Sequence, residues 1–291
     1  MTYLVGYSPR KDDSCALELA CQFARSEPAT VHALTVVPRG WETVAGSATD
    51  GEFEQWAAEE GAASAKEALA QLAEHSGVTS TATWVTGRSV PASILEQAEL
   101  LGASIVVVGS GSEGAEGQVS VTSKTDRLLH SSHVPVVIAP RGYAPAPDST
   151  ITRVTLAFRD DDKTWKLLDQ VASICRTVGA ELRLVTVALR HRGMVTSPAK
   201  QNEDLVFASL RQQVDEAQAE ALEHLASTGL TASTLVAEGT SWAEALGSVP
   251  YQAGDVLVVG SSTTHPLASV FLGSSAAKIV RNSTVPVVVV P

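Results

Sequence analysis

The sequence predicts an α/β protein of two tandem, doubly wound domains, each built on a five-stranded parallel sheet. Three observations lead to this fold class. One pattern of residues recurs 151 positions further along the chain, short runs of Val, Ile and Leu recur within each copy, and helix-forming segments separate those runs. Strands that alternate with helices are joined by right-handed crossovers, which produce a parallel sheet covered by helices.

The repeat also predicts the domain boundaries. Residues 104–110 correspond to 255–261 at an offset of 151. We therefore expect a first domain at residues 1–141, a linker at 142–150 and a second domain at 151–291. Prolines alternate with other residues in the linker and block regular helix and sheet pairing, so the connection is predicted to be semi-rigid.

In the first domain the apolar runs are nearly continuous, as expected for strands buried on both faces. The predicted strands are residues 2–7, 30–37, 79–86, 104–109 and 135–139. Helices are expected between them at residues 12–26, 50–76, 89–101 and 122–132. Residues 52–75 are rich in Ala, Glu and Leu, which are all good helix formers.

The second domain repeats this scheme, with strands predicted at residues 152–158, 181–188, 231–238, 255–260 and 286–290. Its closing strand is apolar and would aggregate as an unpaired edge, and the closing strand of the first domain is a candidate partner. Pro135 and Pro286 fit an edge position. The domains would then pair through their C-terminal strands as a pseudo-twofold unit within one chain. Further dimerisation of the chain stays open.

Composition narrows the class of protein. Hydrophobic residues make up 44% of the chain and charged residues 18%, which suits a globular protein with a real core. Lys and Arg total 21 against 32 Asp and Glu, a net charge of −11 that repels phosphate backbones, so nucleic acid is not an expected partner. Residues 1–150 carry 9 Lys/Arg and 18 Asp/Glu, and the remainder carries 12 and 14, so an anion meets less repulsion in the second half.

Targeting signals and cysteine pairs are not apparent in the sequence. No apolar stretch approaches the roughly 20 residues of a membrane span, and residues 1–7 lack the layout of a signal peptide. The three cysteines include no C-x-x-C pair. We therefore expect a reduced, cytoplasmic protein that does not contact membranes.

The loops after the first and fourth strands are the candidate site, because ligands of a doubly wound sheet bind outside the carboxyl ends of its strands. In the second domain the fourth strand runs into Gly260, and Gly273-Ser274-Ser275 opens the next helix. Gly260 permits a sharp turn, and Gly273 lets a phosphate approach the free N–H groups at the helix start. Ser274 can cap the helix or donate its hydroxyl. The pattern is typical of a phosphate cradle, with a plain turn and cap as the alternative.

This pattern resembles that of the universal stress protein (UspA-like) family. The hallmark of that family is a glycine, two residues, a second glycine, nine residues, and then Gly-Ser or Gly-Thr. Gly260 matches the first glycine, Thr263 stands where the second is expected, and Gly273-Ser274 match the end. The resemblance extends over nearly the whole chain, twice over, so the sequence is similar to a tandem universal stress protein. In that family the closing strand pairs with its counterpart in another domain, so the resemblance implies that the two closing strands of this chain pair.

The resemblance implies an adenine-nucleotide-binding, flavodoxin- or Rossmann-like fold and, for some members, binding of ATP, ADP or AMP with weak or no hydrolysis. Mg²⁺ would be present only if it accompanies the nucleotide. Other members bind no nucleotide and act through partner proteins. The residues expected to contact the nucleotide lie in the second domain and are Ala157, Phe158, Arg159, Val187, Gly260, Ser261, Thr263, Gly273, Ser274 and Ser275.

Besides Thr263, the second domain departs from the family's nucleotide-binding pattern in two features. The usual aspartate after the first strand is Arg159, and the usual basic pair of the phosphate loop is Ser261-Ser262. In one interpretation Arg159 reaches the phosphates, and in another it fills the adenine space.

The first domain departs further, and we expect it not to bind ATP. Ser8 replaces the aspartate, Ser112 replaces the second glycine, and Thr122 brings a β-branched side chain to the phosphate approach. Glu113 and Glu116 are expected to lie near the phosphates. A like-charge contact at about 4 Å costs roughly 1 kcal/mol in water and several times that in a partly dry cleft.

Catalytic patterns are weak in this sequence. Residues 109–114 read G-x-G-x-x-G, but after the fourth strand rather than the first, which disfavours a dinucleotide-dependent dehydrogenase. No clear general base or dedicated metal ligand is indicated, so we predict neither catalytic nor metal-binding residues. The leading hypothesis is a non-catalytic stress-response sensor that binds nucleotide in its second domain. The alternatives are a nucleotide-free scaffold for an unknown protein partner and, less favoured, slow ATP hydrolysis.

Overall fold

The computed structural model describes residues 1–9, 14–38, 48–190, 197–261 and 273–291. The strands of the first domain are β1 (Thr2–Tyr7), β2 (Thr30–Pro38), β3 (Thr79–Gly87), β4 (Ile105–Gly109) and β5 (Val136–Ala139). Helices α1 (Cys15–Ser26), α2 (Ala48–Leu72), α3 (Val90–Leu100) and α4 (Ser123–Ser131) separate them. The predicted alternation of strands and helices is therefore confirmed in this domain.

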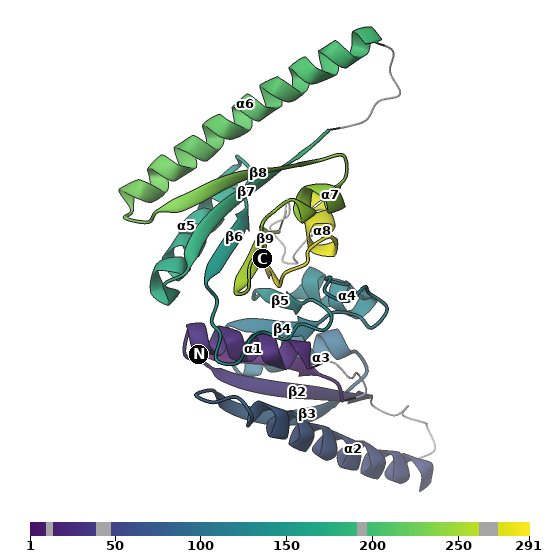
Figure 1. The fold of residues 1–291 in the computed structure, drawn as a ribbon. Coiled ribbons are helices and arrows are strands. Elements are labelled where there is room, and N and C mark those ends of the chain that lie inside the picture. The colour runs from purple at the N-terminus through teal and green to yellow at the C-terminus, as the bar shows by residue number, and fades with distance from the viewer. Residues whose placement is uncertain (10–13, 39–47, 191–196, 262–272) are drawn as a thin grey trace.

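The second domain contains strands β6 (Arg153–Ala157), β7 (Glu181–Leu189), β8 (Ala232–Gly239), β9 (Asp255–Gly260) and β10 (Val287–Val290). Its helices are α5 (Asp162–Val178), α6 (Ser197–Ser227), α7 (Trp242–Gly247) and α8 (Ser274–Arg281). One ten-stranded sheet holds both domains in the order β3-β2-β1-β4-β5-β10-β9-β6-β7-β8 (Figure 1). Strands within each domain run parallel, which confirms two doubly wound, five-stranded units.

The two units join through their closing strands, as expected. β5 and β10 run antiparallel, with Val287 opposite Ile138. Each of these strands is the edge of its own domain, and their pairing places both in the middle of the ten-stranded sheet. Pro135 and Pro286 immediately precede the two strands, where the missing N–H removes no bond from this ladder.

A single apolar core on one face of the sheet spans both domains. It contains Ile138 and Val287 of the closing strands together with Leu128 of α4 and Val280 of α8. The opposite face carries two clusters, one formed with α1 and α2 and the other with α5 and α6. Val288 of β10 packs against both of these clusters, so the closing strands connect the domains on both faces.

The linker between the domains lies against α1. The fully buried side chain of Gln22 donates from Nε2 to the hydroxyl of Ser149 and to the carbonyl of Thr150, each at 3.3 Å. Its Oε1 accepts from the Tyr143 hydroxyl at 2.7 Å. The connection is therefore held on the helix surface rather than left as a free tether.

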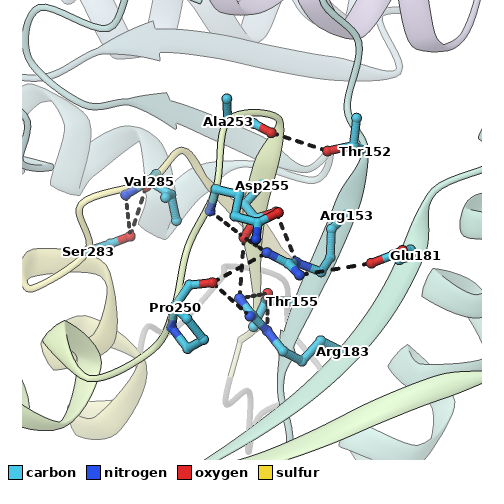
Figure 2. A network of polar contacts seen from close by, with 11 residues as sticks. Thr152, Arg153, Thr155, Glu181, Arg183, Pro250, Ala253, Asp255, Ser283 and Val285 are labelled. Atoms are coloured by element: carbon cyan, nitrogen blue, oxygen red, sulfur yellow. Dashed lines mark hydrogen bonds and ion pairs between the residues drawn. The ribbon is translucent and has the colours of Figure 1, made fainter.

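Buried charges gather at the amino ends of the second domain's strands (Figure 2). The carboxylate of Asp255 accepts from Arg153 Nη2 at 2.7 Å and from Arg183 Nη2 at 3.4 Å. Arg183 also donates to the Thr155 hydroxyl and the Pro250 carbonyl. Burial, and then the neighbouring Arg153, lower the pKa of Arg183 from its ordinary value. Asp255 thus neutralises two guanidinium groups at the amino ends of these strands, on the opposite side of the sheet from their carboxyl ends.

Replacing Asp255 with Asn should lower the free energy of unfolding by about 3 kcal/mol or more, because it leaves the buried Arg183 guanidinium without a carboxylate among the described residues and leaves Arg153 with only the exposed Glu181. Glu181→Gln is the matched control. Its carboxylate lies 3.9 Å from Arg153 and its side chain is 78% exposed, so its loss should cost less than about 1 kcal/mol. Urea denaturation of both variants measures the difference, and equal losses would contradict this account of the cluster.

Helix α2 packs on β3 through a glycine. A Cβ at Gly61 would lie 2.3 Å from Cδ2 of Trp84, whereas one at Gly51 in the same helix would meet no described atom within 4 Å. Gly51→Ala should therefore raise stability by up to about 1 kcal/mol through helix propensity. Gly61→Ala should lower it by about 1–3 kcal/mol, because the indole has to move. Thermal unfolding distinguishes the two, and stabilisation by Gly61→Ala would show that Trp84 does not need this contact.

Candidate functional site

A cleft of about 610 Å³ lies at the carboxyl ends of β6, β7 and β9, bordered by α5, α7 and α8. Nine of the ten residues predicted to contact a nucleotide line it: Ala157, Phe158, Arg159, Val187, Gly260, Ser261, Gly273, Ser274 and Ser275. The tenth, Thr263, lies outside the described residues. The fold thus gathers residues from four separate segments at one edge of the sheet. Their contact with a ligand stays a prediction.

The end of β9 is closely packed against α5. A Cβ at Gly260 would lie 3.0 Å from Cδ2 of Leu167, so this turn has little room for a side chain. The N–H of Ser261 donates to the Val290 carbonyl at 2.8 Å, which fixes the backbone where it leaves the sheet. The hydroxyl oxygen of Ser261 is buried and has no hydrogen-bond partner among the described residues.

Helix α8 begins without a hydrogen bond from a capping side chain of the described residues. Gly273 is the N-cap residue, with φ −58° and ψ 157°, and Ser274 is the first helical residue. The interpretation of Ser274 as the cap is therefore wrong, because the helix already begins at Ser274 and the extended backbone of the cap falls on Gly273. The first N–H groups of a helix have no intrahelical acceptor and carry the positive end of the helix dipole, so they can receive an oxyanion.

The chain leaves β6 through three charged residues. Asp161 caps α5, accepting from the N–H of Thr164 at 2.9 Å, and pairs with Arg159. Burial raises the pKa of Asp161, but these hydrogen bonds outweigh burial and hold the pKa below its ordinary value. The Asp160 carboxylate accepts from Trp165 Nε1 at 2.9 Å. The Arg159 side chain lines the cleft and is 70% exposed, and both of its interpretations stay predictions.

Helix α5 contributes site residues that the sequence analysis missed. Lys163, Lys166 and Gln170 line the cleft and recur at i, i+3 and i+7, on one face of the helix. Their spacing could have identified this face, because the helix after the first strand starts next to the end of the fourth. Trp242 of α7 also lines the cleft, with the ammonium group of Lys278 5.8 Å from its ring centre.

The matching edge of the first domain holds a smaller cavity of about 200 Å³. Ser110 is the counterpart of Ser261, but its hydroxyl donates to the Ala139 carbonyl at 2.7 Å and accepts from the N–H of Ser120 at 3.0 Å. The N–H of Gly111 donates to the Ser120 carbonyl at 3.1 Å. Polar groups of the loop between β4 and α4 are therefore hydrogen-bonded within the domain. A bound anion would need these same groups.

The start of α4 is also closed. Thr122, the counterpart of Gly273, caps the helix by accepting from the N–H of Thr125 at 3.2 Å. A Cβ at Gly111 would lie 2.6 Å from Cγ2 of Thr122, so the threonine methyl group occupies the space beside the loop. This agrees with the hindrance expected from a β-branched residue at that position.

The expected position of the acidic residues in this loop is wrong. Neither Glu113 nor Glu116 lines the cavity of the first domain. The carboxylate of Glu116 lies beside Gly142 of the linker, where a Cβ would be 3.1 Å from its Oε1. The cause is that Arg141 donates from Nη1 to the Gly114 carbonyl at 2.6 Å and draws the loop toward the linker. Charge repulsion by these carboxylates therefore does not explain a lack of nucleotide binding.

Metal-binding clusters and membrane-spanning helices were also sought in the described residues. These residues include no group of three or more His, Cys, Asp or Glu side chains that could hold a metal ion. None of their helices combines the length and apolar character needed to cross a bilayer.

Comparisons with known proteins agree on one family. A model of the universal stress protein family matches residues 1–140 and again 150–291. Universal stress proteins Rv2319c of Mycobacterium tuberculosis and Mb2346c of Mycobacterium bovis are each 34% identical over 297 residues, covering 100% of both chains. A universal stress protein structure from Archaeoglobus fulgidus has a TM-score of 0.68 at 19% identity, covering 99% of this chain and 97% of its own. PA1789 of Pseudomonas aeruginosa, described as functionally unknown, has a TM-score of 0.58 at 17% identity, covering 99% and 92%.

The two structures share the fold over the whole chain, and the mycobacterial relatives share its length. The family model matches once in each half of the repeat. The chain therefore belongs to the universal stress protein family and carries two copies of its domain in tandem.

Proposed function

We propose that the second domain binds ATP, or a related adenine nucleotide such as ADP or AMP, without hydrolysing it, and that the protein acts as a stress-response sensor. The observation that carries this proposal is the cleft at the carboxyl edge of β6, β7 and β9, which the start of α8 lines without a capping side chain. Parallel α/β sheets bind their ligands at this edge.

An adenine nucleotide fits the cleft in size and in chemistry. A cavity of about 610 Å³ lies within the range of small-molecule sites. The N–H groups that begin α8 at Ser274 suit phosphate oxygens, and Gly260 lines the same cleft. Ala157 and Val187 offer apolar surface at the ends of β6 and β7 for the base. Mg²⁺ would enter with the nucleotide, and we assign it no protein ligand.

Binding without hydrolysis is consistent with how the nearby carboxylates are used. Phosphoryl transfer requires a positioned base or water-orienting group and metal ions held in line. Asp161 caps α5 and pairs with Arg159, and Asp160 accepts from Trp165, so both side chains already serve the start of this helix. We therefore assign no catalytic residue.

A nucleotide-free scaffold is the second candidate function. Figure 1 shows α6 extending beyond the sheet, and Leu205 and Val206 on this helix are 69% and 70% exposed. Exposed apolar side chains of this kind are often covered by a partner protein. Arg159, at the position of the family's usual aspartate, also favours this alternative. Titration calorimetry with millimolar ATP decides between the two, because a scaffold of this kind would release no heat of binding.

The closed loop of the first domain predicts one nucleotide per chain. Titration calorimetry of the full-length protein with ATP should give a stoichiometry of one, since Ser110, Gly111 and Thr122 occupy the groups and the space that a phosphate would need. A stoichiometry of two would show that the loop between β4 and α4 opens for a ligand.

The Gly273→Asp variant tests the effect on ligand binding separately from the effect on the stability of α8. Aspartate is a good N-cap and Gly273 already has a compatible φ of −58°, so α8 should be as stable or slightly more stable. The new carboxylate would repel a phosphate at the helix start, and ATP affinity should fall by at least about tenfold. Thr122→Asp is the matched control at the corresponding position of the first domain, and it should leave ATP affinity unchanged. Titration calorimetry and thermal unfolding measure both effects; retained affinity in Gly273→Asp would exclude a phosphate at α8.

A further inference from the structure

We propose that α5 supplies the positive charge that holds the phosphate chain in the cleft, and that the cleft therefore selects nucleotides with several phosphates over nucleosides and monophosphates. The residues concerned are Lys163 and Lys166, with Gln170 as a neutral hydrogen-bonding neighbour. This inference rests on the proposed function and deepens it, because it names the ligand class and the side chains that select it.

The first support is the position of these side chains. Lys163, Lys166 and Gln170 lie on one face of α5, and all three line the cleft. Leu167, between them in sequence, contacts the end of β9 closely enough that a Cβ at Gly260 would be 3.0 Å from its Cδ2. The lysine-bearing face of α5 therefore borders the strand end from which the chain runs into Ser261 and, further on, to the start of α8.

The second support is that Lys166 is available to a ligand. Its side chain is exposed and makes no ion pair with a described residue. Lys163 already interacts with another group of the chain, so it contributes charge at the cleft without being free. Asp161 and Asp162 lie at the positive end of the α5 dipole, and Lys166 lies one turn further on, on the face that lines the cleft. An anion in the cleft would give Lys166 a charge partner.

The first domain provides an internal comparison. At the offset of 151, Cys15 corresponds to Lys166 and Leu19 to Gln170. Cys15 is buried, and its Sγ would lie 2.9 Å from a Cβ at Gly109. At these two positions the domain whose loop is closed carries buried side chains, whereas the domain with the larger cleft carries Lys166 and Gln170. The counterpart of Lys163 is Asp12, which lies outside the described residues.

The lysines on α5 occur together with the replacement of a basic pair in the loop after β9. The resembled pattern places a basic pair where this chain has Ser261-Ser262. Charge on α5 can replace charge on that loop, because both border the same cleft. Lysine acts as a point charge toward phosphate and does not require the fixed geometry of a bidentate contact, so a different helix can supply it.

Titration calorimetry of the full-length protein with adenosine, AMP, ADP and ATP tests the inference. In the wild type, affinity should rise with each added phosphate. Lys166→Gln should weaken ATP binding by about tenfold, and the double variant with Lys163→Gln by more, while adenosine affinity changes less than about twofold. The decrease of ATP affinity with salt should also become less steep in the double variant. Lys66→Gln on α2 is the control with the same charge change, and it should leave all four affinities unchanged.

The outcomes separate the two proposals. If wild-type protein binds neither ATP nor adenosine, the proposed function fails and the inference fails with it. If wild-type protein binds ATP and the double variant binds it equally well, the inference alone is wrong. An equal loss for adenosine and ATP would also overturn it, because the lysines would then shape the cleft rather than recognise phosphate. Thermal unfolding of each variant verifies that these exposed substitutions leave the fold intact.

Discussion

The antiparallel ladder between β5 and β10 is the interaction on which the rest of the structure depends. Each parallel unit ends in a short valine-rich strand with an unpaired row of N–H and C=O groups, which is a liability for aggregation. Pairing these two strands satisfies those groups and places Ile138 and Val287 in a core shared by both domains. With this edge used for assembly, the carboxyl ends of the other strands remain available for ligands.

The two domains show how the same scaffold can carry different hydrogen bonding at equivalent positions. Ser110 and Ser261 follow equivalent strands, yet the first hydroxyl is bonded on both sides and the second has no described partner. Thr122 and Gly273 begin equivalent helices, one with a side-chain cap and one without. The fold is common to both, and the chemistry is set by the loops and helix ends placed upon it.

Most of the architecture could be predicted from the sequence, because strand and helix periodicity, the offset of 151 and the apolar closing strands are all local patterns. Nine of the predicted site residues line one cleft. They could be predicted because the ends of the strands can be recognised from local sequence patterns. Lys163 and Lys166 do not lie at a strand end and were missed. Their i, i+3 spacing marks one face of α5 in the sequence, but only the packing of α5 against β9 shows that this face borders the cleft. The position of Glu116 was predicted wrongly because its loop is held by Arg141, a contact that no local pattern reveals.

The linker held by Gln22 has a consequence for assembly. When two partners of a ladder belong to separate chains, dilution favours dissociation and the folded fraction depends on protein concentration. Here both partners are in one polypeptide, and a short docked connection keeps their effective concentration high. The pairing of β5 with β10 therefore becomes a unimolecular event, and its extent does not depend on how many copies of the protein a cell contains.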